Sequence, residues 1–144
     1  MPCPSKLVEL PCNKSGVGFT SAPYTTTSTT LQLQTGNGAM FPVIPPGKHF
    51  YARIYGCNCC AEVKVTAIVG DTMTVAPLAG AGCNCIPSVA TVKFTESSRA
   101  AMSELMIEAI GALNFTPPLK FDCATKTVSI DCATMKSGCA PCAA

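Results

Sequence analysis

One predicted hairpin restricts the fold of this chain more than any other feature of its sequence. From Glu62 to Val69 apolar and polar residues alternate, with Val63, Val65, Ala67 and Val69 on one face. This period-two pattern is typical of a strand with one buried side. Gly70-Asp71 follows as a two-residue turn, and residues 72–75 return as the partner strand. The hairpin predicts an antiparallel sheet at the centre of the fold.

Further strands are expected before this hairpin. Residues 31–34 alternate in polarity and are followed by a glycine-containing turn at 35–38. Residues 49–55 are rich in aromatic and β-branched side chains, which favour extended backbone. His49 is expected to pack beside Tyr51 or to face water, rather than to act as a general base.

A helix is expected at about residues 95–113, where apolar residues recur at three- and four-residue spacing. Thr95 or Ser97 is a candidate N-cap. Glu104 and Glu108 are expected on the opposite, wet face. The stripe predicts core packing, and an adaptable binding groove is the alternative use of its methionines. Its members are Met102, Leu105, Met106, Ala109, Ile110 and Leu113.

These elements predict an α+β, β-rich fold: a small twisted antiparallel sheet, one packed amphipathic helix and extended termini. Three parts are expected, namely an extended N-terminal arm at 1–30, a β-rich domain at 31–121 and a cysteine-rich C-terminal hairpin and tail at 122–144. Prolines and a threonine-rich run disfavour helix in the arm, which is either a flexible leader or a segment that lies on a neighbouring subunit. The tail repeats Asp-Cys-Ala-Thr at 122–125 and 131–134, and a hairpin is expected to turn near Thr125 and Lys126.

The charge content of the chain points to assembly. Charged residues make up 12% of the sequence, about half of the usual share of roughly 25%. So little charge favours burial of the surface against neighbouring subunits. The net charge of +2 and the lack of a Lys/Arg run argue against a nucleic-acid partner. No apolar run reaches the roughly 18 residues that a membrane span needs.

Eleven cysteines are the second unusual feature of the sequence. Because eleven is odd, at least one thiol must stay free, bind a ligand or bridge to another chain. The hairpin brings the clusters at 57–60 and 83–85 to one end of the sheet, where one or two cross-links are expected. Interchain bridges are expected from the two ends of the chain, at Cys3, Cys12, Cys139 or Cys142. All eleven are disulfide candidates: Cys3, Cys12, Cys57, Cys59, Cys60, Cys83, Cys85, Cys123, Cys132, Cys139 and Cys142.

Other chemistry is possible for these thiols. The alternative hypothesis is that a zinc ion or an iron–sulfur cluster is bound by five of them: Cys57, Cys59, Cys60, Cys83 and Cys85. The C-x-C-C and C-x-C spacings differ from the usual C-x₂-C pairs of zinc fingers. The C-x-x-C motif at 139–142 lacks the strand–helix frame of redox enzymes. Asp122 and Asp131 are interpreted as turn residues rather than an acid–base pair. We therefore expect no enzyme.

The cysteine content is typical of oxidising compartments or of metal sites. The first six residues show no secretory signal pattern. Three explanations stay open: a signal removed earlier, metal binding by the thiols, or release of the protein by host lysis followed by oxidation.

The order of several short motifs resembles a small β module of tailed-bacteriophage virion proteins, found in tail fibres and baseplate components. These motifs are Thr30-Leu31-Gln32-Leu33, Phe41-Pro42, Gly47, Tyr51-Ala52-Arg53-Ile54, Glu62-Val63-Lys64-Val65-Thr66-Ala67 and Gly70-Asp71-Thr72-Met73-Thr74-Val75. They cover about a third of the chain. This sequence departs from the module by inserting Cys57-Asn58-Cys59-Cys60 and Cys83-Asn84-Cys85.

The resemblance implies a structural or assembly component of a phage virion, in the tail, baseplate or neck, with no catalytic residues. Its partners would be other virion proteins in a multi-copy assembly, and its location the extracellular particle after host lysis. Intrachain and interchain disulfides would stabilise it. Two alternatives stay open: a thiolate metal- or iron–sulfur-binding structural protein, and a secreted disulfide-rich binding domain.

Overall fold

The computed structural model describes residues 5–56, 60–78, 85–96, 99–113 and 119–130. It contains two compact units, of which one comprises Lys6–Met102 and the other Met1–Ser5 with Ser103–Ala144. The described residues form a curled antiparallel sheet of six strands, two short two-stranded sheets and one α-helix. The expectation of a β-rich α+β fold is confirmed.

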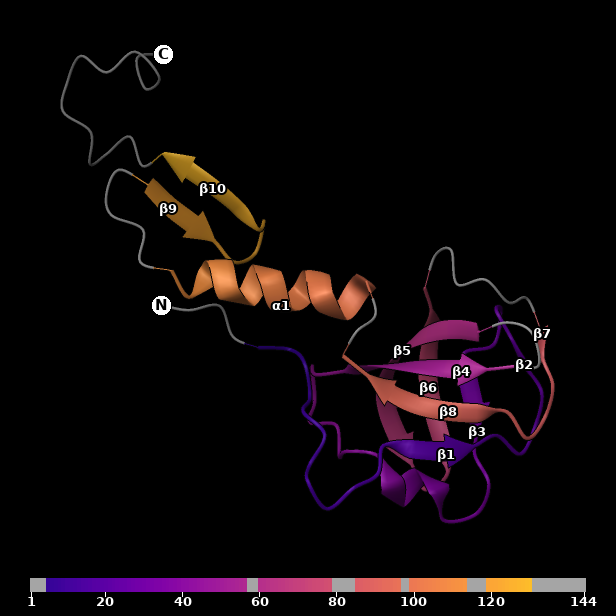
Figure 1. Ribbon diagram of the computed structural model, residues 1–144. Helices are drawn as coiled ribbons and strands as arrows, with labels where there is room; N and C mark the ends of the chain where they lie inside the picture. The colour runs from indigo at the N-terminus through magenta and orange to yellow at the C-terminus, as the bar shows by residue number, and fades with distance from the viewer. Residues whose placement is uncertain (1–4, 57–59, 79–84, 97–98, 114–118, 131–144) are drawn as a thin grey trace, which may run out of the picture. The chain divides into compact units, whose positions relative to one another are not determined.

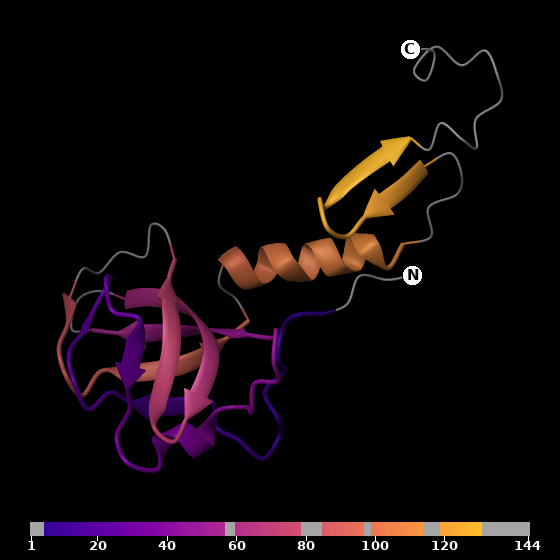
Figure 2. The ribbon, with the colours of Figure 1, turned by 180° about the vertical axis from the view of Figure 1, so that it is seen from behind.

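The six-stranded sheet closes on itself into a small barrel (Figures 1 and 2). The residues that directly follow the two edge strands pair with each other, through an antiparallel bridge between Thr20 and Leu33. The amide of Ser21 donates to the carbonyl of Gln32, and that of Gln34 to the carbonyl of Phe19, each at 2.9 Å. Closure satisfies backbone groups that an open edge would expose. The strand order is β1 (Val17–Phe19), β8 (Thr91–Thr95), β4 (Phe50–Tyr55), β5 (Cys60–Val69), β6 (Thr72–Pro77) and β3 (Thr30–Gln32).

Smaller elements complete the structure. In the barrel unit, β2 (Tyr24–Thr25) pairs with β7 (Cys85–Ile86), and η1 (Asn37–Met40) is a single 3₁₀ turn. Helix α1 comprises Arg99–Gly111. In the other unit, β9 (Leu119–Asp122) pairs with β10 (Thr127–Ile130) in an antiparallel hairpin. Among the described residues, no helix has both the length and the apolar character that a bilayer crossing requires.

The predicted central hairpin is present as β5 and β6, but a β-bulge changes which residues face the core. Val63 and Val65 are fully buried, as the alternation predicts. The register then shifts between Val65 and Ala67. Because a bulge adds one residue to one strand, the inward side of the later residues reverses. Ile68 therefore packs against the core, and Val69, expected on the buried face, is 79% exposed.

The barrel begins earlier in the chain than the expected boundary at residue 31. Strand β1, from the segment predicted to be an extended arm, pairs with β8 from Val17↔Lys93 to Phe19↔Thr91. Thr20 is fully buried, and its hydroxyl accepts the amide of Ala90 at 2.9 Å. Residues 17–25 are therefore part of the folded unit and not of a free arm.

Aromatic rings fill much of the barrel interior. Phe50 of β4 stacks on Phe41 with centroids 6.0 Å apart, and it meets Phe94 of β8 at 5.2 Å. Aliphatic side chains from every strand of the barrel unit except β1 and β2 join them in the core. The buried cluster consists of Tyr24, Leu31, Leu33, Phe41, Phe50, Ala52, Ile54, Ala61, Val63, Val65, Met73, Val75, Ile86, Ala90 and Val92.

Asp71, in the turn between β5 and β6, fastens η1 to the barrel. One carboxylate oxygen accepts the amide of Gly38 at 2.8 Å, and the other accepts the amide of Gly36 at 3.1 Å. Its carbonyl accepts the amide of Leu33 at 2.8 Å. Each hydrogen bond to a charged group contributes about 1.5–3 kcal/mol. The predicted turns at 35–38 and 70–71 therefore form one structural unit.

The C-terminal hairpin turns where it was expected to turn, with Thr127 opposite Asp122. The Asp122 carboxylate accepts the amides of Ala124 at 2.8 Å and Thr125 at 3.4 Å. These hydrogen bonds, led by that of Ala124, lower the pKa of Asp122 because they stabilise the charged carboxylate. Asp122 is thus a turn residue, and Asp131 lies outside the described residues.

Tyr24 carries a buried hydroxyl group that has no hydrogen-bond partner among the described residues. Desolvation raises the pKa of Tyr24 above its ordinary value of 10.0. Folding favours the neutral phenol, so the associated stability is present below about pH 10 and is lost as the pH rises through the raised pKa.

We predict that Tyr24→Phe leaves the free energy of unfolding at neutral pH unchanged or raises it by up to about 1 kcal/mol, since it removes a polar group buried without a partner. The loss of stability above about pH 10 should also become smaller. Urea denaturation of both proteins, at neutral and alkaline pH, measures these effects. A loss of more than about 1 kcal/mol at neutral pH would show that the hydroxyl is hydrogen-bonded in the folded protein.

Candidate functional site

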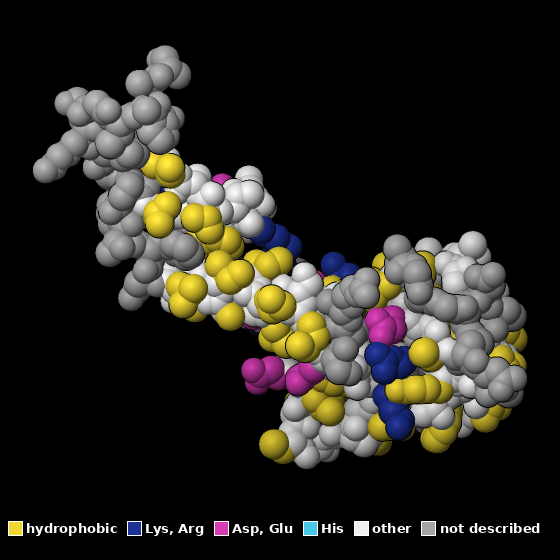
Figure 3. Space-filling model, turned by 45° about the horizontal axis from the view of Figure 1, so that its top comes forward, with side chains coloured by type: hydrophobic (Ala, Val, Ile, Leu, Met, Phe, Trp, Pro, Cys, Tyr) yellow, Lys and Arg dark blue, Asp and Glu magenta, His cyan; other side chains and the backbone are white. Residues whose placement is uncertain are grey.

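Helix α1 presents a continuous apolar face to solvent. Four large apolar side chains of the helix and one in the turn that follows it are between 38% and 63% exposed. Ala109, between them, is exposed as well. Hydrophobic side chains follow one another along the helix in Figure 3. The stripe expected in the core is therefore outside it, and that prediction is wrong. We call this surface the α1 stripe: Met102, Leu105, Met106, Ala109, Ile110 and Leu113.

The opposite side of the helix is the more covered one. Ala101 and Gly111 are buried, while Glu104, Ile107 and Glu108 are partly buried. Successive residues of a helix are about 100° apart, which places these five opposite Met102 and Ala109. The two glutamates expected on the wet face are therefore on the better covered face. A surface helix normally buries its apolar face. In α1 the covered side carries Ala101 and Ile107 as well as the two glutamates, while the wholly apolar stripe is exposed.

Burial of the exposed α1 stripe would contribute further hydrophobic free energy. Full burial of a leucine, isoleucine or methionine side chain contributes about 1.5–3 kcal/mol. Five such side chains, each about half exposed, leave roughly 4–7 kcal/mol for each copy of the chain. An exposed apolar patch of this kind marks an interaction site. The stripe is therefore the strongest candidate for a functional surface among the described residues.

The structure describes the side chains of three of the eleven cysteines. Cys12 and Cys60 are exposed free thiols, and Cys123 is disulfide-bonded. Cys85 is in β7, where its backbone pairs with Thr25. The others lie outside the described residues: Cys3, Cys57, Cys59, Cys83, Cys132, Cys139 and Cys142.

Because Cys12 and Cys60 are free thiols, fewer cysteines are left to form disulfides within the chain. Eleven cysteines less these two leave nine, which is again an odd number. At least one more cysteine must lack a partner within the chain, so three or more thiols are available for other uses. Neither Cys12 nor Cys60 is the partner of Cys123.

We predict that a thiol-alkylating reagent, applied to the native protein without reductant, modifies Cys12 and Cys60 but not Cys123. Exposed thiols react through their thiolate form, whereas a disulfide must first be reduced. Mass mapping of the peptides before and after reduction gives the result. Protection of both Cys12 and Cys60 before reduction would contradict the assignment, and Cys123 serves as the internal control.

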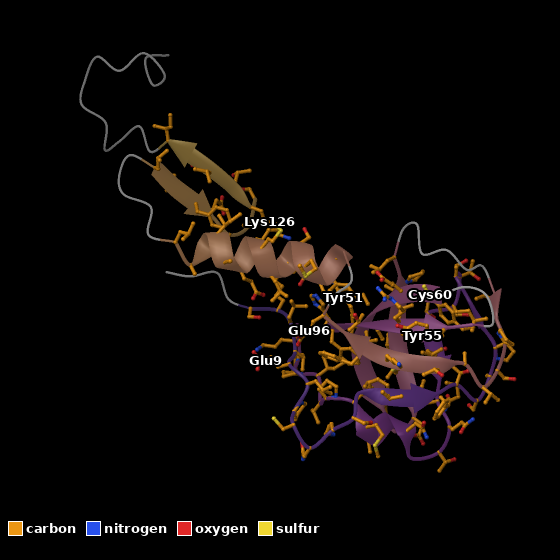
Figure 4. All side chains as sticks on the ribbon, viewed as in Figure 1. Glu9, Tyr51, Tyr55, Cys60, Glu96 and Lys126 are labelled. Carbon is orange, nitrogen blue, oxygen red and sulfur yellow. The ribbon has the colours of Figure 1, made fainter. Side chains whose placement is uncertain are left out.

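Cys60 lies at the start of β5, beside a group of polar and aromatic side chains on the outer surface of the barrel (Figure 4). Its cross-strand neighbour is Tyr55 of β4. Arg53 donates to Glu62 through Nε at 3.1 Å and also through Nη2. Hydrogen bonds to Glu62 and then to Tyr55 raise the pKa of Arg53. The ammonium group of Lys93 lies 5.5 Å from the centroid of the Tyr55 ring. These contacts tie β8, β4 and β5 together.

The alternative metal site falls largely on residues that the structure does not describe. Cys57, Cys59 and Cys83 are among them, and the side chain of Cys85 is not described either. Within the described part of the chain, no group of three His, Cys, Asp or Glu side chains is arranged to hold a metal ion.

His49 packs beside Tyr51, as the sequence predicts. It is buried, and the two rings meet edge to face with centroids 5.4 Å apart. Its backbone forms a bridge with Leu7, and its amide donates to the carbonyl of Lys6 at 2.9 Å. His49 therefore has a packing role, in which it holds residues 6–8 against the barrel.

No protein-family model matches the chain, and no curated protein matches it.

Proposed function

We propose that this chain is a structural component of a bacteriophage virion, in the tail, baseplate or neck, which functions by joining a multi-copy particle. The single observation that carries the proposal is the α1 stripe, an uncharged apolar surface that is exposed although the other side of the same helix is partly or fully buried. A surface of this kind is stable when another protein covers it. In an assembled particle, neighbouring subunits bury such a surface.

Three further observations support the same function. The barrel interior is filled by packed side chains such as Phe41, Phe50 and Ile54, which gives a rigid scaffold. Strands β3 to β6 carry most of the motifs that resemble the phage β module. The three or more cysteines without an intrachain partner supply thiols for bridges between subunits once the particle leaves the cell.

Density-gradient centrifugation tests the proposal. Particles would be purified from the lysate of a host that carries the gene, and the chain would be quantified by mass spectrometry in each fraction. We expect the chain in the particle fraction, in several copies per particle. A chain that stays with soluble proteins at the top of the gradient would contradict the proposal.

The same particles test the role of sulfur. Electrophoresis without reductant should show this chain in species larger than the monomer, which disappear when reductant is added. Identical mobility under both conditions would exclude interchain disulfides, although non-covalent membership of the particle would stand.

A further inference from the structure

We propose that α1 joins copies of this same chain into a bundle of three or more helices. The inference names the partner in the proposed assembly and rests on the proposed function for its biological setting. Its evidence is the spacing, width and charge of the α1 stripe. The association of copies is measured on the isolated chain, so this inference can fail while the particle experiment succeeds, and the reverse.

The spacing of the stripe is that of a helix seam. Met102, Met106, Ala109 and Leu113 follow at intervals of four, three and four residues. This is the alternation of d and a positions in a coiled coil, where side chains of one helix insert between four residues of the next. Such a seam is self-complementary, because each copy offers the same apolar row to its neighbour.

The width of the stripe indicates more than two helices. Leu105 and Ala112 occupy the g positions of this register and Ile110 an e position, and all three are exposed. In two-stranded coiled coils these flanking positions are usually charged, because they lie at the edge of a narrow seam. Apolar flanks widen the stripe to about 160° at roughly 100° per residue. A helix with so wide an apolar face fits a bundle in which it contacts a neighbour on each side.

Charge on the helix is compatible with self-association. Between residues 100 and 113 the only charged residues are Glu104 and Glu108. Both are opposite the stripe, so like charges do not meet in the seam. Arg99, at the first position of α1, is the only lysine or arginine in the sequence from residue 99 to residue 113, whereas helices that lie on lipid surfaces are typically rich in these residues. These facts favour a second copy of the chain over a membrane as the partner.

The area of the stripe limits how tightly copies can bind through it. Its five large side chains leave on the order of 200 Å² of apolar side-chain area on each helix. A stable pairwise interface covers about 800 Å² on each partner. A bundle buries both flanks of each stripe but no more area than the stripe offers. A particle that holds the copies close together raises their effective concentration and strengthens such an association.

Sedimentation velocity of the full chain, in reductant and over a wide range of protein concentrations, tests the inference. We expect association from the 14.9 kDa monomer to a species of three or more copies. Met106→Lys, which places a charge in the seam, should raise the dissociation constant at least about tenfold, a change of 1.4 kcal/mol. Far-ultraviolet circular dichroism would show that the barrel of each variant is folded.

Val69→Lys is the matched control, because Val69 is an apolar residue on the barrel that is 79% exposed, compared with 63% for Met106. It should associate like the wild type. A wild-type chain that remains monomeric at every concentration would overturn the inference. So would a Met106→Lys variant that associates like the wild type, or a Val69→Lys variant that dissociates to the same extent as Met106→Lys.

Discussion

Replacement of Gly38 by alanine is expected to destabilise the barrel by about 3 kcal/mol or more, at the upper end of the effects of overpacking. A Cβ atom at this position would collide with the carbonyl oxygen of Gly70 and would lie 2.9 Å from its carbonyl carbon. Both atoms belong to the backbone of the turn between β5 and β6, so no side-chain rotation can relieve the contact. Either η1 or the turn must move, and the hydrogen bonds of Asp71 to Gly36 and Gly38 would be strained or lost.

Denaturant unfolding monitored by circular dichroism measures this effect. Gly47→Ala is the matched control, because a Cβ there meets open space and the only strain is its positive φ of 78°. That strain costs about 1–2 kcal/mol. Equal stability of the two variants would show that η1 does not rest against the turn in solution.

Replacement of Phe50 by alanine is expected to cost about 3–5 kcal/mol, which is the usual range for a buried phenylalanine. Phe50 is almost fully buried and contacts two other rings, those of Phe41 and Phe94. Truncation removes the ring and leaves a cavity that a closed barrel cannot easily collapse, because the strands on all sides are hydrogen-bonded to each other.

Two control variants separate this effect from a general loss of aromatic surface. Phe50→Leu preserves much of the volume and should cost less than the alanine variant. Phe19→Ala removes a ring that is 43% exposed on β1 and should cost less than Phe50→Ala, because less burial is lost. Thermal or urea unfolding gives all three values. A Phe50→Ala protein as stable as Phe19→Ala would contradict the position of Phe50 in the core.

The local parts of the fold were predictable from the sequence, whereas the long-range parts were not. The β5–β6 hairpin is encoded within fourteen residues by alternation and a two-residue turn, so short-range reasoning finds it. Barrel closure depends on pairing between Val17 and Lys93 and between Thr20 and Leu33. Pro11 and Pro23 argue against regular structure in that segment, although the β-branched Val17, Thr20 and Thr25 are compatible with a strand.

The β-bulge after Val65 illustrates a second limit. The alternation in the sequence continues through Ala67 and Val69 and contains no sign of an extra residue. Only the register against β6 shows that Ile68, and not Val69, faces the core. The roles of Gly38 and Asp71 could not be recognised either, because the hydrogen bond between them joins two turns across 33 residues of sequence.

For the candidate site, the sequence predicted the members of the stripe but not their environment. The spacing of Met102, Met106 and Ala109 determines which helix face is apolar. It contains no information on whether that face meets the core of the same chain or another subunit, since both are apolar surroundings. The observed exposure of the stripe distinguishes these cases. For the cysteines, pairing depends on distances that spacing alone does not supply.

Oxidative footprinting of methionine is the most direct test of the central claim that this chain acts by being joined to other subunits through α1. Peroxide converts accessible methionines to sulfoxides. Met102 and Met106 of the stripe are 50% and 63% exposed, Met40 on η1 is 42% exposed, and Met73 is fully buried in the barrel. In the assembled state Met102 and Met106 should be protected while Met40 reacts and Met73 does not. If Met102 and Met106 oxidise there as fast as Met40, the stripe is uncovered and the claim is wrong.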